Sequence, residues 1–277
     1  MEDILEILQK FVKNNSIIVI AIFVVIVHGL TKKLLTWTNP EKDNDEDDNI
    51  HPDGLDEKQE FIPYTPPRFS ESEMIKRSKE FYKEMNERRS VRFFSDKDVP
   101  LEVIENIIRT AGTAPSGAHT EPWTYVVVKS FDIKQKIKEI VEREEEINYK
   151  KRMGKQWVKD LEFLKTNWLK PYMTTAPYII VVFKQTYGIT LDGGRKTNYY
   201  HEVSASISCG LLLAAIQHAG LVTLTSTPLN AGPALRDLLN RGKNEKVLLL
   251  LPVGYPSDDC RVPHIHRKKL NEIMVTV

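Results

Sequence analysis

The chain has 277 residues, of which 41% are hydrophobic and 28% are charged. This composition is typical of a globular protein with one large domain or two small ones. The formal net charge of +1 gives no general attraction to nucleic acid, so we expect no nucleic-acid partner. Cys209 and Cys260 are too few for a disulfide framework. Because His264 and His266 alone are a weak metal signal, we also expect no metal site.

The N-terminal part contains an uncharged run at residues 16–30 that is dominated by branched aliphatic side chains. The run is shorter than the ~20 residues that a membrane-spanning helix needs, but apolar residues on both sides extend it. Acidic residues precede it and no small-residue cleavage site follows, which disfavours a cleaved signal peptide. We therefore expect a single-pass membrane anchor over residues 1–38. Lysines flank both ends, so the orientation, and the choice between plasma membrane and endomembrane, stay open.

Residues 39–69 are acidic and polar and contain several prolines, which predicts a flexible tether. From residue 70 to residue 277 the pattern is that of a folded domain. Apolar spacing predicts helices at 73–88, 100–110, 132–168 with a break near Gly154, 198–219 and 232–241. Strands are predicted at 123–128, 177–183, 221–227 and 246–253. Because helices and strands alternate irregularly, we expect an α+β sandwich rather than a doubly wound sheet.

Two short stretches point to a nucleotide-like cofactor. Arg88, Arg89 and Arg92 lie within five residues, and a guanidinium group binds phosphate oxygens in a bidentate manner. Residues 115–118 are Pro-Ser-Gly-Ala at the end of a helical pattern, and small residues allow backbone N–H groups to approach a flat ligand. Together they favour a flavin, although an arginine-rich pentamer also occurs as a solvated helix end.

A possible substrate site lies in the charged helix at 132–168. Glu145 and Tyr149 are four residues apart and therefore share one helix face, and Lys170 follows downstream. A carboxylate, a phenol and an ammonium group can together bind both charges of an amino-acid zwitterion. Alone, however, the acidic run at 142–146 also fits a solvated helix face.

Several separated blocks of the chain resemble one protein family. They are residues 88–92, 113–123, 144–149, 166–168, 252–256 and 273–277. In these blocks the chain resembles the iodotyrosine deiodinases, a membrane-anchored branch of the nitroreductase-like flavoproteins. The resemblance implies an α-β-α sandwich that forms an intertwined homodimer with FMN at the subunit interface. It also implies reductive dehalogenation of mono- and diiodotyrosine to tyrosine and iodide, which salvages iodide. The electrons then come ultimately from NADPH through a separate flavin reductase.

The same resemblance implies roles for individual residues. FMN binding is expected of Arg88, Arg89, Ser90, Val91, Arg92, Pro115, Ser116, Thr225, Ser226, Thr227 and Arg267. Catalytic roles are expected of Thr225 and Thr227, as hydroxyl donors near the flavin, and of Ala118, whose N–H would hold the substrate phenolate. Glu145 is expected to bind the α-ammonium group, and Tyr149 and Lys170 the α-carboxylate. The charged helix would then close over the flavin as a lid.

Two other functions remain open at this point. One is a general nitro or quinone reductase on the same scaffold, and the other is a non-catalytic membrane-tethered protein that binds flavin or iodotyrosine. A promiscuous reductase does not need a zwitterion clamp, and an intact arginine cluster argues against the loss of the cofactor. The sequence does not identify the halogen of the substrate (iodine, bromine or chlorine) or the reductase.

Overall fold

The computed structural model describes residues 61–164 and 166–277. The predicted anchor at 1–38 and the tether up to residue 60 lie outside these ranges. Residues 61–69 of the predicted tether have no regular secondary structure and expose their side chains. Within the described ranges, no helix has both the length and the apolar character needed to cross a membrane.

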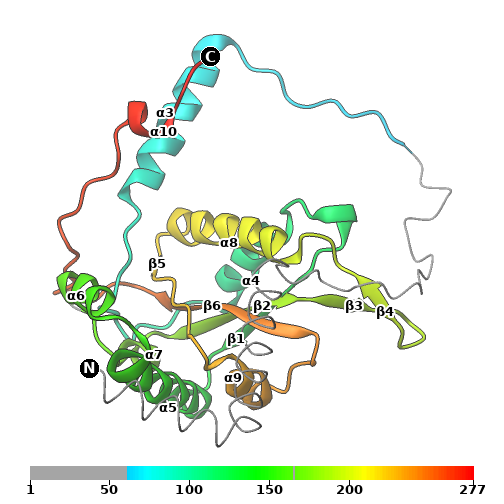
Figure 1. Ribbon diagram of the computed structural model, residues 1–277. Helices are drawn as coiled ribbons and strands as arrows, with labels where there is room; N and C mark the ends of the chain where they lie inside the picture. Colours follow the sequence, from blue (N-terminus) through cyan, green and yellow to red (C-terminus); the bar gives the residue numbers. More distant parts are fainter. Residues whose placement is uncertain (1–60, 165) are drawn as a thin grey trace, which may run out of the picture. The chain divides into compact units, whose positions relative to one another are not determined.

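The centre of the fold is a four-stranded sheet in which all neighbouring strands are antiparallel (Figure 1). In spatial order its strands are β1 (Trp123–Val128), β2 (Tyr178–Gln185), β6 (Glu245–Gly254) and β5 (Val222–Thr223). Side chains alternate between the two faces of β2, and every residue at 178–183 is fully buried. A strand buried on both faces requires a cover on each side of the sheet.

Helices provide that cover on both faces. On one side lie α5 (Phe131–Ile147), α7 (Tyr172–Thr175) and α9 (Gly232–Leu238), which bury Ile137, Met173 and Leu235. On the other side lie α4 (Leu101–Gly112) and α8 (His201–His218), which bury Ile104, Ile107 and Leu212. Figure 1 shows these two layers with the sheet between them, so the predicted α-β-α sandwich is confirmed.

The remaining elements differ in part from the predicted helices and strands. They are α3 (Glu71–Glu87), the short turn η1 (Gly117–His119), the π-helical turn η2 (Asn148–Arg152), α6 (Lys155–Phe163), the hairpin β3 (Tyr187–Ile189) and β4 (Arg195–Thr197), and α10 (Leu270–Ile273). The long helix predicted at 132–168 breaks at 153–154 as expected, but α6 ends at Phe163 rather than at residue 168. The hairpin was not predicted because strands of three residues are too short to show an alternating pattern.

The strand predicted at 221–227 pairs regularly only at Val222 and Thr223. Ser226 then meets Leu250 in an isolated antiparallel bridge, with N–H···O distances of 2.9 and 2.8 Å in the two directions. The side chains of Thr225 and Thr227 are exposed on either side of this bridge. The segment is therefore anchored to β6 while two of its hydroxyl groups face outward.

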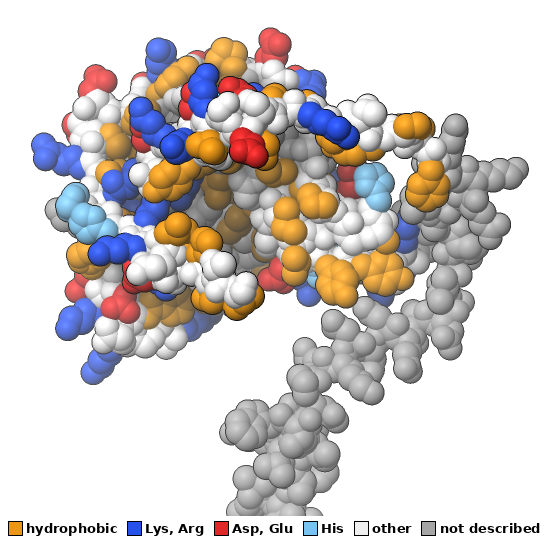
Figure 2. All heavy atoms as spheres, turned by 90° about the horizontal axis from the view of Figure 1, so that it is seen from above, with side chains coloured by type: hydrophobic (Ala, Val, Ile, Leu, Met, Phe, Trp, Pro, Cys, Tyr) orange, Lys and Arg blue, Asp and Glu red, His pale blue; other side chains and the backbone are white. Residues whose placement is uncertain are grey.

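Some helices expose apolar side chains that the sandwich does not bury. α3 has no buried residue and exposes Met74, Ile75 and Phe81, and α8 exposes Val203 and Ile207. The C-terminal residues add Ile273, Met274, Val275 and Val277. Figure 2 shows a face that is hollowed near its middle, with hydrophobic side chains around the hollow.

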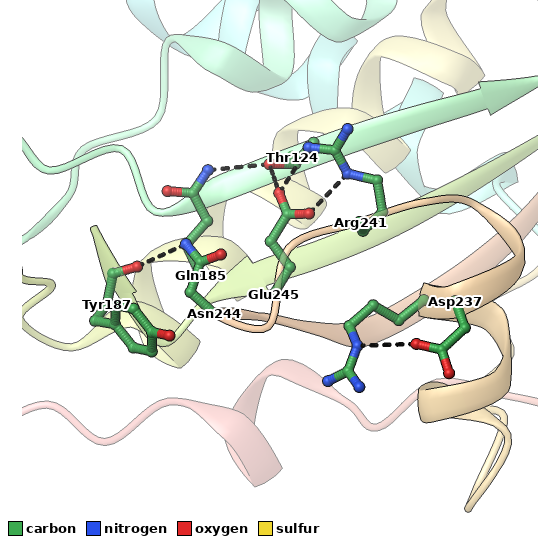
Figure 3. A network of polar contacts seen from close by, with 8 residues as sticks. Thr124, Gln185, Tyr187, Asp237, Arg241, Asn244 and Glu245 are labelled. Atoms are coloured by element: carbon green, nitrogen blue, oxygen red, sulfur yellow. Dashed lines mark hydrogen bonds and ion pairs between the residues drawn. The ribbon is translucent and has the colours of Figure 1, made fainter. Parts of the chain in front are cut away.

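A polar network joins the strands β1, β2 and β6 at one end of the sheet (Figure 3). Glu245, at the start of β6, is only 2% exposed. Its carboxylate accepts hydrogen bonds from Arg241 Nε at 2.7 Å, Arg241 Nη2 at 3.0 Å and Thr124 Oγ1 of β1 at 2.5 Å. Burial alone would raise the pKa of Glu245, but the hydrogen bonds from Arg241 and Thr124 outweigh it and lower the pKa below its usual range.

We predict that Glu245→Gln lowers the free energy of unfolding by about 2 kcal/mol at pH 7, because charge-assisted hydrogen bonds are lost. A carboxyl with a lowered folded-state pKa stabilises the fold above its unfolded pKa of about 4.3, and this contribution disappears as the pH falls through the folded value. Urea unfolding at pH 7 and near pH 3 measures the difference. Glu139→Gln is the control, because Glu139 is exposed and accepts only from Gln135. An equal loss at both pH values would contradict the role of the charge.

Candidate active site

Pairing at the edge of the sheet places two predicted cofactor segments side by side. α3 ends at Glu87, and the chain then runs past β5, where Ser90 forms a parallel bridge with Thr223. The N–H of Val91 donates to the carbonyl of Thr223 at 3.1 Å. Residues 88–92 are therefore fixed next to the chain that continues into residues 225–227.

The arginines of this region contact backbone carbonyls of the chain. Arg89 donates to the carbonyl of Pro263, and Arg267 Nη2 donates to the carbonyls of Asn86 at 3.3 Å and Arg88 at 2.9 Å. In the part of the chain that the structure describes, none of Arg88, Arg89, Arg92 and Arg267 pairs with a carboxylate. Burial, and then the nearby Arg267, lower the pKa of Arg88. Such uncompensated positive charge fits a phosphate group.

The structure also brings the predicted substrate residues and the hydroxyl residues into one cavity. This cavity has a volume of about 260 Å³. Its lining includes Arg92, Glu145, Tyr149, Lys170, Thr225, Ser226 and Thr227. All seven of these residues were predicted to bind either FMN or substrate, and they come from positions far apart in the sequence. The cavity thus joins the two halves of the predicted site.

Two opposite charges face each other inside the cavity. Glu145 Oε2 lies 3.8 Å from Lys170 Nζ, and the two side chains are 12% and 6% exposed. Lys170 Nζ also donates to the carbonyl of Asn167 and lies 5.8 Å from the ring centre of Tyr149. Burial lowers the pKa of Lys170, whereas the charge of Glu145 acts in the opposite direction. The pair is therefore partly dehydrated, which strengthens its attraction for charged ligand groups.

A buried asparagine connects α5, the helix that carries Glu145, to the chain that follows residues 225–227. Glu145 lies in the last turn of α5, Tyr149 lies in η2, and Asn148 between them is fully buried. Asn148 Nδ2 donates to the carbonyl of Leu229 at 3.1 Å, and its Oδ1 accepts from Asn230 Nδ2 at 3.2 Å. The sequence pattern did not predict a role for Asn148, whose only signal was an uncharged polar residue inside a strongly charged helix.

Three apolar residues of the cavity wall were also not predicted from the sequence. Met153, Trp157 and Leu161 line the same cavity from η2's end and from α6. Trp157 and Leu161 are four residues apart on α6, and this spacing places them on one helix face, whereas Met153 precedes the helix with an extended backbone. That periodicity was available in the sequence, but the surrounding charges concealed it.

Eight predicted residues do not line this cavity, namely Arg88, Arg89, Ser90, Val91, Arg267 and three residues of the η1 segment. Pro115, Ser116 and Ala118 surround η1 and are not among the residues that line the cavity. Ser116 Oγ accepts the N–H of Glu121 at 3.0 Å, and Ala118 has the left-handed backbone angles φ 48° and ψ 31°. One copy of the chain therefore does not bring this segment to the clamp.

Val91, a predicted FMN contact, has its side chain in the hydrophobic core and its N–H bonded to Thr223. Its side chain and N–H therefore hold the arginine segment in place instead of facing a ligand.

The comparisons with known proteins agree with the fold. Residues 85–255 match the nitroreductase family, and this range contains the whole central sheet. A solved nitroreductase with bound FMN from Bacteroides fragilis has a TM-score of 0.55 and 18% identity, and the alignment covers 72% of this chain and 99% of that chain. At this identity the likeness concerns the fold alone.

Other similar proteins identify a narrower group within the nitroreductase family. An iodotyrosine deiodinase of Hydra vulgaris is 64% identical over 255 residues, which are 92% of this chain and 93% of the relative. Iodotyrosine deiodinase 1 of Homo sapiens is 61% identical over 222 residues, 80% of this chain and 77% of the relative. A crystal structure of oxidized iodotyrosine deiodinase bound to FMN and 3-iodo-L-tyrosine has a TM-score of 0.59 and 27% identity, covering 68% of this chain and 96% of that chain. The chain belongs to the nitroreductase family, and within it to the iodotyrosine deiodinases.

We predict that Gly117→Ala destabilises the η1 segment, because a Cβ atom there would lie 2.8 Å from the carbonyl oxygen of Tyr199. The backbone of residues 115–118 or of Tyr199 must then move, at a cost of about 1–3 kcal/mol. The midpoint of urea unfolding measures this effect. Gly112→Ala is the matched control, because nothing lies within 4 Å of a Cβ at Gly112. Identical midpoints for the two variants would show that the close approach does not constrain the segment.

Proposed function

We propose that this chain is an FMN-dependent iodotyrosine deiodinase that converts mono- and diiodotyrosine to tyrosine and iodide. The observation that carries the proposal is the cavity in which Glu145, Tyr149 and Lys170 face residues 225–227. The relatives at 64% and 61% identity are iodotyrosine deiodinases, and a structural relative binds both FMN and 3-iodo-L-tyrosine. Recovery of iodide from iodinated tyrosines follows from this reaction.

The proposed cofactor site depends on arginines that have no carboxylate partner among the described residues. Arg88, Arg89, Arg92 and Arg267 would hold the FMN phosphate together with Ser90, since none of these guanidinium groups has a carboxylate partner among the described residues. The exposed hydroxyls of Thr225 and Thr227 would donate hydrogen bonds to the flavin ring. When bound in its reduced form, FMN supplies the two electrons by which iodotyrosine and a proton become tyrosine and iodide.

The substrate end is a clamp for a zwitterion. Glu145 and Lys170 lie 3.8 Å apart, and an amino acid would enter between them. Its α-ammonium group would pair with Glu145, and its α-carboxylate would pair with Lys170 and accept a hydrogen bond from Tyr149. Each buried charge would exchange one counter-ion for another, so binding leaves no buried charge unpaired. This requirement distinguishes an amino-acid substrate from a simple nitro compound or quinone.

The helix α6 supports the predicted lid. It has no buried residue of its own, and Trp157 and Leu161 form part of the cavity wall. Small changes in the position of α6 would therefore alter the cavity without disturbing the core. We infer that α6 closes over the bound substrate and excludes water.

We infer further that two copies form an intertwined homodimer with FMN at their interface. Pro115, Ser116 and Ala118 do not line the cavity of their own chain, so a second copy would have to supply them. The exposed apolar residues of α3, α8 and the C-terminal tail offer surface for that contact. In this arrangement the backbone N–H of Ala118 would hold the substrate phenolate.

The remaining elements of the proposal concern electrons and location. The sequence contains no G-x-G-x-x-G motif, so we propose that electrons reach the flavin from NADPH through a separate flavin reductase. Residues 1–38 would anchor the protein in a membrane, and residues 39–69 would tether the catalytic domain to that anchor.

We predict that Arg88→Ala and Arg267→Ala each raise the Kd for FMN at least tenfold, because a charge-assisted contact to phosphate is lost. Flavin absorbance of the purified protein and titration with FMN measure this change. Arg109→Ala is the control, because Arg109 is exposed and contacts only Glu105 and Asn106. Full FMN occupancy in both cluster variants would remove the phosphate assignment.

We also predict that Glu145→Gln raises the KM for iodotyrosine at least tenfold, a loss of about 1.4 kcal/mol or more. Iodide release under reducing conditions measures the rate. Glu146→Gln is the control, because Glu146 pairs with the exposed Lys150. With a substrate analogue that lacks the α-amino group, the difference between Glu145→Gln and the unmodified protein should vanish. An unchanged KM for iodotyrosine would exclude the clamp.

A further inference from the structure

One carboxylate beside the cavity does not belong to its lining and has no role in the clamp described above. Glu142 lies on α5, one turn before Glu145, and its side chain is 20% exposed. Its Oε1 accepts the backbone N–H of Lys170 at 2.5 Å. The nearest cation on its own helix, Lys138, has its Nζ 4.0 Å away. The closest contact of this carboxylate is thus a backbone group of the clamp lysine.

Lys170 needs such a contact because no regular element positions it. It lies between α6 and α7, in a segment without helix or strand. Its carbonyl accepts the N–H of Met173 at 3.0 Å, in the first turn of α7. Among the described residues its N–H donates to Glu142 alone, and an ionised acceptor forms a shorter and stronger bond than a neutral one. Glu142 therefore fixes the point from which the lysine side chain extends toward Glu145.

The same face of α5 holds this segment at a second point. Lys134 lies eight residues before Glu142 and is only 5% exposed. Its ammonium group donates to the carbonyl of Ala176 at 2.7 Å, and to those of Thr174 at 3.3 Å and Pro177 at 3.4 Å. Residues three or four positions apart are neighbours on a helix surface, so Glu145 lies beside Glu142, and Lys134 lies two four-residue steps before Glu142 on the same side of α5. The helix that carries Glu145 thus also fixes the chain that carries Lys170.

We propose that Glu142 is a positioning residue for substrate recognition, which sets the distance between the two charged arms of the clamp. It does so by holding the backbone of Lys170 against α5. A long lysine side chain has large rotational freedom, so binding of the α-carboxylate depends on a fixed backbone origin. The proposal rests on the proposed function, because it takes an amino-acid zwitterion as the ligand of the clamp.

The test is titration of the FMN-loaded full-length protein with 3-iodotyrosine, followed by flavin fluorescence. Glu142→Ala removes the acceptor and should raise the Kd at least fivefold. Glu142→Gln removes the charge but keeps an acceptor oxygen, and should stay within twofold of the unmodified protein. Glu139→Ala, on the exposed side of α5, is the control. If Glu142→Ala does not fold, Glu142→Asp replaces it, because its shorter side chain withdraws the carboxylate from Lys170.

Three further measurements distinguish a positioning role of Glu142 from a general effect of the substitution on charge or stability. With 3-iodotyramine, which has the ammonium group but no carboxylate, Glu142→Ala should bind as tightly as the unmodified protein. In a Lys170→Met background, Glu142→Ala should have no further effect. The Kd for FMN should be unchanged.

The proposal is overturned if Glu142→Gln binds 3-iodotyrosine as weakly as Glu142→Ala does. It is also overturned if Glu142→Ala still weakens binding of 3-iodotyramine, or weakens binding in the Lys170→Met background. If the unmodified protein does not bind 3-iodotyrosine, the proposed function itself fails.

Discussion

The pairing of Glu145 with Lys170 in a partly dehydrated cavity is the constraint on which the site depends. Both side chains are largely buried, so each requires an opposite charge in every state of the protein. A ligand that carries one charge would leave one of the two groups unpaired. A zwitterion satisfies both, which is why we propose that this cavity selects amino acids. In the proposed complex, the aromatic part of the ligand would extend toward the hydroxyl groups of residues 225–227.

The second determinant is the position of the arginine segment at the edge of the sheet. Residues 88–92 are bonded to Thr223 on one side of β5, while Ser226 is bonded to Leu250 of β6. The sheet therefore holds the arginines proposed to bind phosphate and the hydroxyl groups proposed to contact the flavin in a fixed relation. Asn148, through Leu229 and Asn230, connects this part of the sheet with the end of α5 that carries Glu145. In the proposed function, this separation would allow the substrate-binding helix to close without loss of the cofactor.

Much of this arrangement could be predicted from local sequence patterns. Both faces of β2 are apolar, so the sandwich follows from periodicity, and the spacing of Glu145 and Tyr149 placed them on one helix face, although their substrate role came from the family resemblance. Lys170 and Arg267 were assigned only by family resemblance, because irregular segments carry them and no periodicity relates them to their neighbours. Asn148 was missed because its contacts cross the fold to residues distant in sequence. The placement of Ala118 outside the cavity depends on tertiary packing, which local patterns do not encode.

The most direct measurement is a single turnover of the protein with FMN bound and reduced in the absence of oxygen. One equivalent of 3-iodotyrosine is added, and the flavin spectrum, tyrosine and iodide are then quantified together. The account predicts that the oxidised flavin spectrum returns while one tyrosine and one iodide appear per flavin. A flavin that stays reduced while iodotyrosine is recovered intact would contradict it.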